Sequence, residues 1–240
     1  DMEQVQLVKQ GRDAVAQWRE EHPNEVLDLN ASYLSYARLH QVDLRGADIR
    51  DSVLLGAVMV RANLSGCHLN PCHMYRADLR QADMSRSLMN GANLRGANLR
   101  DANLSISDMD RAVLSDANLT GADLNGANLT GTDLTGADLR EAQLTGVDLN
   151  GLDLTKTMMN PPSPWWTDLT GANLNQTVLV NADITNSTIE KGKLDQALLS
   201  YTKIIEGTVS GCHLSGQNMT AANLREEELS EAHLRGANLT

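Results

Sequence analysis

The chain has 240 residues and a hydrophobic fraction of 41%, yet aromatic residues make up only 3% of it and Phe is absent. Because globular cores usually draw much of their buried area from aromatic rings, this composition predicts a core of small aliphatic side chains. Twenty Lys and Arg against 31 Asp and Glu give a net charge of -11, which argues against direct binding of nucleic acid through its phosphates. No apolar run is long enough to predict membrane insertion.

The cysteine content and the N-terminal sequence indicate the cellular compartment in which the protein is expected. Three Cys, an odd number, do not predict a disulfide framework, and they favour a reducing environment. The N-terminus has no basic region followed by an apolar stretch, as a signal peptide would. We therefore expect a cytoplasmic protein, with the thylakoid lumen or the periplasm as the alternative if a signal peptide preceded Asp1.

The N-terminal segment has the pattern of an amphipathic helix over residues 2–21, which His22 and Pro23 end. The residues expected on its apolar stripe are Leu7, Gly11, Ala14, Val15 and Trp18. The next part of the chain is repetitive, and a stack of repeats needs a cover for its first exposed unit. We expect residues 1–24 to form this cap.

From residue 25 to residue 240 the chain repeats every five residues. A large aliphatic residue, Leu in most repeats and otherwise Met, Ile or Val, recurs from Leu29 to Leu239, and only Pro164 interrupts it. A small residue stands two places before nearly every one of these centres. A period of five fits neither the 3.6 of a helix nor the 2 of a flat strand, so the chain must turn once in every repeat.

The segments ANLRGANLRDANLS (residues 92–105) and ANLTGADLNGANLTGTDLTGADLR (residues 117–140) carry this pattern in its clearest form. They resemble the pentapeptide-repeat family. The resemblance implies an all-β fold, a right-handed quadrilateral parallel β-helix with four repeats per turn, which gives about eleven coils here. Residues 6–24 are similar to the helical lead-in of many cyanobacterial members, so a cyanobacterial type of protein is expected.

One segment departs from the repeat. In MMNPPSPWWTD (residues 158–168), Pro162 and Pro164 occupy the two inward positions, and Pro cannot donate a hydrogen bond to a neighbouring coil. We predict a loop at 160–167. The repeats then run on to Thr240, and an uncapped last coil would be available for self-association.

A solenoid filled with its own side chains has no interior site, and the sequence contains no recognisable catalytic motif, so no enzymatic activity and no cofactor is expected. The best metal candidate is the pair of Cys-His dipeptides at residues 67–68 and 72–73. The register places both Cys inward and both His outward, so no metal site is predicted. His213 and His233 lie 20 residues apart and would stack in neighbouring coils, but two ligands alone make a weak site.

Acidic residues suggest an alternative function. Some pentapeptide-repeat proteins use an acidic rod to imitate DNA and bind DNA gyrase. Here Asp133 and Asp153 share one side, but the other acids are dispersed, and the Phe centres of that subgroup are missing. Asp and Asn before each centre are better explained as acceptors for turn hydrogen bonds.

The aromatic side chains are the best candidates for a contact surface, because all of those in the repeats fall at outward positions and aromatic anchors dominate protein interfaces. These residues are Trp165, Trp166, Tyr33, Tyr36, Tyr75 and Tyr201. The sequence thus predicts a non-enzymatic rigid scaffold or protein-binding rod with an unidentified protein partner. The alternative is a DNA mimic that binds gyrase or another topoisomerase.

Overall fold

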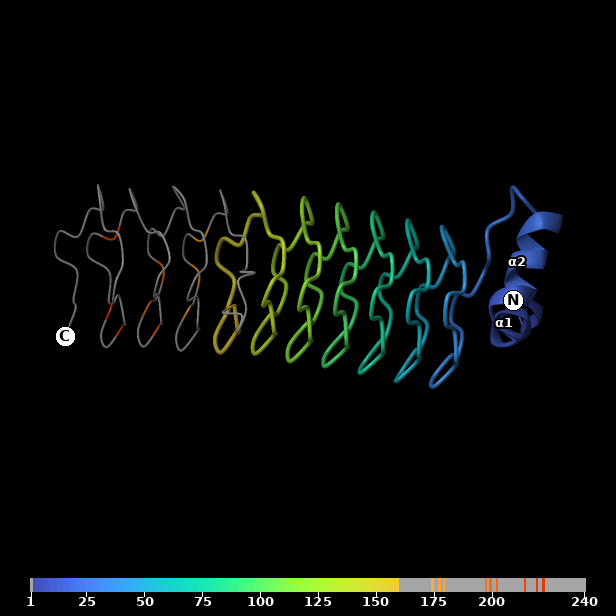
Figure 1. Cartoon of the computed structure of the whole chain (residues 1–240), viewed down its shortest axis with the longest axis horizontal. Coiled ribbons are helices and arrows are strands. Elements are labelled where there is room, and N and C mark those ends of the chain that lie inside the picture. Colours follow the sequence, from blue (N-terminus) through green and yellow to red (C-terminus); the bar gives the residue numbers. More distant parts are fainter. Residues whose placement is uncertain are drawn as a thin grey trace.

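The computed structural model describes residues 2–159 and nine single residues after them. The chain begins with two helices, α1 (Met2–Lys9) and α2 (Arg12–Glu21), and then winds into coils stacked along one axis (Figure 1). The single residues are Leu174, Thr177, Leu179, Ala197, Leu199, Thr202, Leu214, Met219 and Ala222.

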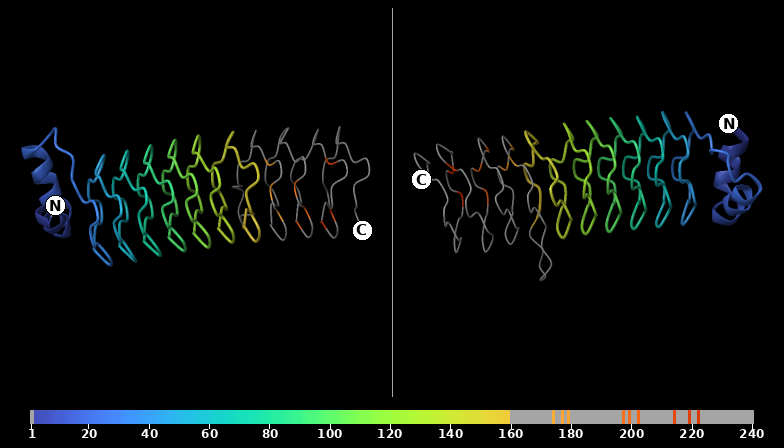
Figure 2. Two further views of the ribbon diagram at one scale, coloured as in Figure 1. Left: turned by 180° about the vertical axis from the view of Figure 1, so that it is seen from behind. Right: turned by 90° about the horizontal axis from the view of Figure 1, so that it is seen from above.

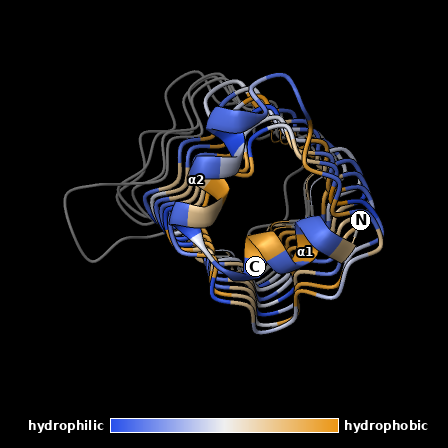
Figure 3. Cartoon of the chain, turned by 90° about the vertical axis from the view of Figure 1, so that its right-hand side faces the viewer, coloured by the Kyte–Doolittle hydropathy of each residue, from blue (hydrophilic) through white to orange (hydrophobic). Residues whose placement is uncertain are grey.

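The single helix expected over residues 2–21 is wrong. Gly11 has a φ of 97°, a left-handed conformation that favours glycine, and it separates α1 from α2. The buried side chains also differ from the expected stripe. Val15 of the expected stripe is fully buried, but so is Val8, which the stripe omitted, whereas Leu7 and Trp18 are only partly buried against the core. Breaking the helix lets two short segments lie across the end of the coils (Figure 3).

The coils are joined by single parallel β-bridges between residues 20 positions apart, from Asp28 with Asp48 to Asp138 with Met158. Within each step the backbone bonds repeat: the amide of Leu29 donates to Asp48 O over 2.8 Å, and that of Asp48 donates to Leu27 O over 2.9 Å. A turn follows every five residues, so the described residues contain bridges and no extended strand. The same stacking is visible from behind and from above (Figure 2).

Each coil therefore has four five-residue sides, as the resemblance to the pentapeptide-repeat family implied. The stacked-coil architecture is confirmed for residues 27–159. The expected count of about eleven coils and the expected loop at 160–167 depend on residues outside this range, so both stay predictions.

The interior is built from two residues per side. Every centre from Leu29 to Met159 is buried, and so is the small residue two places earlier, except Ala37, which is partly buried. In the coils up to Met159 the interior holds no aromatic ring. Identical stacked cross-sections accept one Leu-sized and one small side chain, which explains the aromatic deficit of the sequence.

The corners require a left-handed backbone once per side. Glycine occupies many of these positions, but residues with side chains occupy others, for example Arg111 at φ 54° and Ile106 at φ 58°. Pro71 cannot adopt a positive φ, and a cis Asn70-Pro71 peptide bond stands at that corner. The stacked coils thus hold many L-residues in a conformation they rarely adopt alone.

We expect Ile106→Gly to stabilise the protein by about 1 kcal/mol. A β-branched residue at positive φ costs about 1–2 kcal/mol, and glycine removes this cost at a smaller entropic one. Ile106 is 60% exposed, so little packing is lost. Urea unfolding measures the change. Val113→Gly is the control, because Val113 lies outside the positive-φ corners, and it should destabilise; equal effects of the two substitutions would contradict this explanation.

Side chains of the cap make the hydrogen bonds to the first coil that a neighbouring coil makes elsewhere in the stack. In the second coil Asn63 O and Ser65 O accept hydrogen bonds from the amides of Leu44 and Gly46. The corresponding carbonyls of the first coil, those of Asp43 and Arg45, accept instead from the Arg19 guanidinium, over 2.8 Å in each case. The amide of Asp28 likewise donates to the Gln4 side-chain oxygen over 2.6 Å, where later coils offer a backbone carbonyl. Polar side chains of α1 and α2 therefore satisfy the edge of the first coil.

Candidate functional site

Three of the predicted contact residues lie together. Tyr33, Tyr36 and Tyr75 are on the side whose centres are Leu34, Leu54 and Met74, which we call the tyrosine side. Tyr33 pairs with Val53 in the next coil, and Val53 pairs with His73 in the one after. Tyr33 and Tyr36 are 76% and 70% exposed. Large rings are thus presented to solvent on a rigid backbone.

Each of the other two tyrosines has a defined neighbour. A Cβ added to Gly56 would lie 2.8 Å from the Tyr36 ring, so this ring packs against the glycine corner of the next coil. The Arg76 guanidinium sits 5.0 Å from the centre of the Tyr75 ring, a cation–π distance. Both contacts hold the rings against the coil surface.

The apolar surface continues beyond the tyrosines. Leu55 lies on the same side between Tyr36 and Tyr75, and Met2 of α1 is almost fully exposed. Met2, Val5 and Tyr33 help to line a pocket of about 260 Å³ between α1 and the first coil. Val53, Leu55 and Met2 are not among the contact residues expected from the sequence. Stacking the sequence at 20 residues would have revealed Val53 and Leu55, whereas the position of Met2 depends on how the cap packs.

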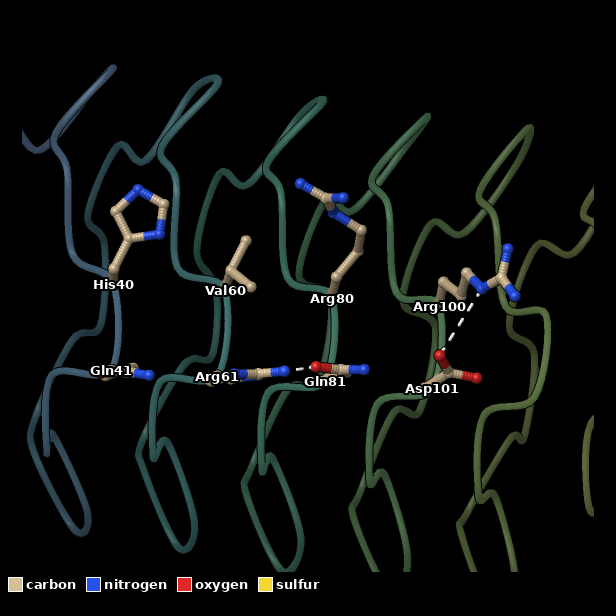
Figure 4. Close-up of a pocket in the computed structure, with 8 residues that line it drawn as sticks. All are labelled: His40, Gln41, Val60, Arg61, Arg80, Gln81, Arg100 and Asp101. Carbon is tan, nitrogen blue, oxygen red and sulfur yellow. Dashed lines mark hydrogen bonds and ion pairs between the residues drawn. The ribbon is translucent and has the colours of Figure 1, made fainter.

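The next side, centred on Leu39, Met59, Leu79 and Leu99, is rich in arginine, and we call it the arginine side. It carries a shallow groove of about 530 Å³ (Figure 4). The residues that line the groove are His40, Gln41, Val60, Arg61, Arg80, Gln81, Arg100 and Asp101. It shares a corner with the tyrosine side at Tyr36 and Arg76.

The arginines of this groove are held by short local contacts. Arg61 Nε donates to Gln81 Oε1 over 2.8 Å, and Arg100 Nε lies 3.5 Å from Asp101 Oδ2. Arg80 donates two hydrogen bonds to Asp78, which hold the pKa of that carboxyl below its ordinary value. The groove is therefore a preformed row of guanidinium groups on neighbouring coils.

Asp133 and Asp153, the acidic candidates, serve the turns. Asp133 Oδ1 accepts a hydrogen bond from the Thr135 amide over 3.0 Å, and Asp153 Oδ1 accepts one from Thr155 over 2.8 Å. Asn118 makes the same bond to Thr120 over 3.0 Å. Asp and Asn are thus used alike, so the charge itself is not what the position requires.

Asp133→Asn is expected to leave the free energy of unfolding nearly unchanged, because the amide oxygen still accepts from Thr135. Asp133→Ala should lower it by about 1 kcal/mol through the loss of this hydrogen bond. Urea unfolding of both variants measures the difference. A large loss in the Asn variant would show that the negative charge at Asp133 is what matters.

The two Cys-His dipeptides are split between interior and surface. Cys67 and Cys72 are fully buried, whereas His68 and His73 are exposed. Among the described residues, no group of His, Cys, Asp or Glu is arranged to hold a metal ion. Burial raises the pKa of the thiols of Cys67 and Cys72 to about 12.

In the native protein these thiols should not react with a disulfide reagent such as DTNB at pH 8, because they are buried and remain protonated at that pH. Reactivity should appear only on unfolding in denaturant. A Cys212→Ser background limits the measurement to Cys67 and Cys72. Rapid native-state reaction of either thiol would contradict the buried position.

The other candidates lie outside the described residues: Trp165, Trp166 and Tyr201 among the aromatics, and His213 with His233. The structure therefore does not place them. Among the described helices, none has the length and apolar character needed to span a membrane.

Comparisons with known proteins agree with the repeat pattern. The family described as pentapeptide repeats matches in eight copies, over residues 32–70, 72–111, 112–151, 122–159, 166–200 and 210–240. No protein among those of curated function matches the sequence.

Similar solved structures include two pentapeptide-repeat proteins and one fluoroquinolone resistance protein. HetL from the cyanobacterium Nostoc, involved in heterocyst differentiation regulation, is 25% identical over 94% of this chain and 91% of its own, with a TM-score of 0.36. Another Nostoc protein, alr5209, is 30% identical over 55% of this chain and 81% of its own, with a TM-score of 0.26. The plasmid-mediated fluoroquinolone resistance protein QnrB1 is 16% identical over 89% and 85%, with a TM-score of 0.28. Since the repeat matches extend over most of the sequence, this chain belongs to the pentapeptide-repeat family.

Proposed function

We propose that this protein is a non-enzymatic rod that binds a partner protein through the tyrosine side. The observation that carries the proposal is the grouping of Tyr33, Tyr36 and Tyr75 with Val53 and Leu55 on three successive coils. Aromatic anchors on a rigid surface lose little conformational entropy on binding. We further propose that the coils form a right-handed β-helix of about eleven turns in the whole chain.

The composition of the tyrosine side supports this function over a purely structural one. In the coils up to Met159 the interior already buries the centre of each side, so the exposed rings of Tyr33 and Tyr36 contribute little to the core. Outward positions elsewhere in the coils are mostly polar or glycine. Trp165 and Trp166 are proposed as a second contact region of the same rod.

The DNA-mimic alternative has weaker support. Asp133 and Asp153 are engaged in turns, and Asn fills the same position in other coils. The similarity to QnrB1 is too low to carry an argument about function. A gyrase supercoiling assay tests it directly: inhibition or protection at sub-micromolar protein would replace the proposed function with this one.

The proposed function is tested by capturing partners from cells of the source organism with the full chain as bait. The double variant Tyr33→Ser/Tyr36→Ser should lose the captured protein. Ile106→Ser is the matched control, because Ile106 is an exposed apolar residue on the side opposite the tyrosines. Equal capture by both variants would contradict a contact through the tyrosine side.

A further inference from the structure

The tyrosine side and the arginine side together carry a concentrated positive charge in an otherwise acidic protein. From Tyr33 to Asp101 these two sides hold six arginines but only two acidic residues. The arginines are Arg38, Arg61, Arg76, Arg80, Arg95 and Arg100, and the acids are Asp78 and Asp101. The net charge of the whole chain is -11, so this excess of four positive charges is local.

The same two sides change sign farther along the rod. Between Val113 and Met158 they carry five acidic residues and two basic ones. The acids are Asp116, Asp133, Asp138, Glu141 and Asp153, and the bases are Arg140 and Lys156. The positive region is therefore bounded along the axis, with the cap at one end and an acidic surface at the other.

Apolar groups lie within this positive region. Tyr36 occupies the corner between the two sides, and Val60 lies in the floor of the arginine groove between His40 and Arg80 (Figure 4). Arg38 is exposed, and its side chain makes no ion pair or hydrogen bond with the described residues. A ligand that matches the region must supply both negative charge and apolar side chains.

We propose that the tyrosine and arginine sides of the first four coils bind a short acidic segment of a partner protein, in extended conformation and with apolar side chains among its acids. The proposal rests on the proposed function and names the chemistry of the partner. Its acids would pair with Arg38, Arg61 and Arg100, and its apolar side chains would pack on the tyrosines and Val60.

The size of the region favours such a segment over a nucleic acid. Four coils at about 4.8 Å spacing extend over roughly 14 Å, which an extended peptide of about five residues spans. A nucleic acid strand carries a charge at every nucleotide and would continue onto the acidic surface beyond Val113, where it is repelled. A peptide can end or lose its charge at that point.

The experiment is selection of random twelve-residue peptides, displayed on phage, against the immobilised full chain. We expect the enriched peptides to carry more Asp and Glu than Lys and Arg, together with Leu, Ile or aromatic residues. Their affinity, measured by fluorescence polarisation, should fall at least 10-fold for Arg38→Glu/Arg61→Glu. The control Arg86→Glu/Arg111→Glu makes the same charge change on the other two sides and should have no effect. Glu141 occupies the same corner position as Arg61 four coils farther along the rod, so Glu is tolerated at that corner.

Salt dependence of the unmodified chain gives a second readout that does not rely on a variant folding. Binding of the enriched peptides should weaken at least 10-fold between 0.05 M and 0.5 M NaCl.

Enrichment without an acidic excess, no enrichment, or equal loss in both double variants would overturn the proposal. Binding of a labelled twelve-nucleotide DNA strand, lost in Arg38→Glu/Arg61→Glu, would assign the surface to nucleic acid instead. If partner capture needs Tyr33 and Tyr36 but not the arginines, this inference fails while the proposed function stands.

Discussion

Leu119→Asp is expected to destabilise the protein by about 4 kcal/mol, which is a fall of roughly 10 °C in the melting temperature. Leu119 is completely buried, and Leu99 and Leu139 at the same position in the neighbouring coils are equally buried. A carboxylate there would face stacked aliphatic side chains with no cation. This carboxyl group must either be protonated or reach solvent by local unfolding of its coil.

The repeat architecture adds a second expected effect of Leu119→Asp. Each coil contacts only its neighbours, so a defect in one coil uncouples the coils on either side of it. Unfolding in urea, followed by circular dichroism, should therefore become broader or split into two steps.

Thr120→Asp is the matched control, because it introduces the same charge one residue later at an outward position. The turn bond from the Thr120 amide to Asn118 does not use the Thr120 side chain, so this variant should unfold like the original chain. Similar losses in the two variants would show that Leu119 is not in the interior.

Arg19→Ala is expected to cost about 2 kcal/mol, the second largest effect, by removing the donors that close the edge of the first coil. The Arg19 side chain is only 15% exposed, and it reaches two backbone carbonyls that no backbone amide of the described residues serves. Burial lowers the pKa of the Arg19 guanidinium below its ordinary value, but the group stays charged at neutral pH. Without it the carbonyls of Asp43 and Arg45 lose their charge-assisted partner.

Arg19→Lys should recover less than half of this loss, because a lysine cannot donate to two carbonyls with the planar geometry of a guanidinium. Thermal unfolding measures the stability, and amide exchange at residues 26–31 and tryptic cleavage after α2 report on the attachment of the cap. Arg12→Ala is the control, since Arg12 is exposed and makes one side-chain hydrogen bond to Gln41. An effect of Arg19→Ala no greater than that of Arg12→Ala would refute the role of Arg19 at this edge.

Much of the interior could be predicted from the period alone. The pattern placed Leu99 and Cys67 inward and Tyr33 and His68 outward, and the structure shows each of these positions. It also predicted that Asp and Asn before the centres serve the turns, as Asp133 does. These predictions succeed because a strict five-residue repeat leaves only one assignment of inward and outward positions.

The sequence predicted a cap over residues 1–24, but the break between its two helices and their docking on the first coil could not be predicted in the same way. A single glycine inside a helical pattern costs only about 1 kcal/mol, so the sequence does not decide whether Gly11 continues or breaks a helix. Val8, which the expected stripe omitted, is fully buried because α1 lies across the coil end at its own angle. The bonds of Arg19 and Gln4 depend on the same docking geometry.

The sequence by itself determined the repeating inward pair and hence the small aliphatic core, since nearly every repeat has the same two inward residues; the four-sided coil followed from the resemblance to the pentapeptide-repeat family. Only the tertiary structure decided how the first coil is closed, and it showed that corners such as Ile106 and Arg111 take a positive φ without glycine. It also brought Met2 of α1 beside Tyr33. The physical reason is that the inward pair of each side is set by the local repeat. The hydrogen-bonding groups at the edge of the first coil, in contrast, are paired by side chains of α1 and α2, whose positions depend on how these helices pack.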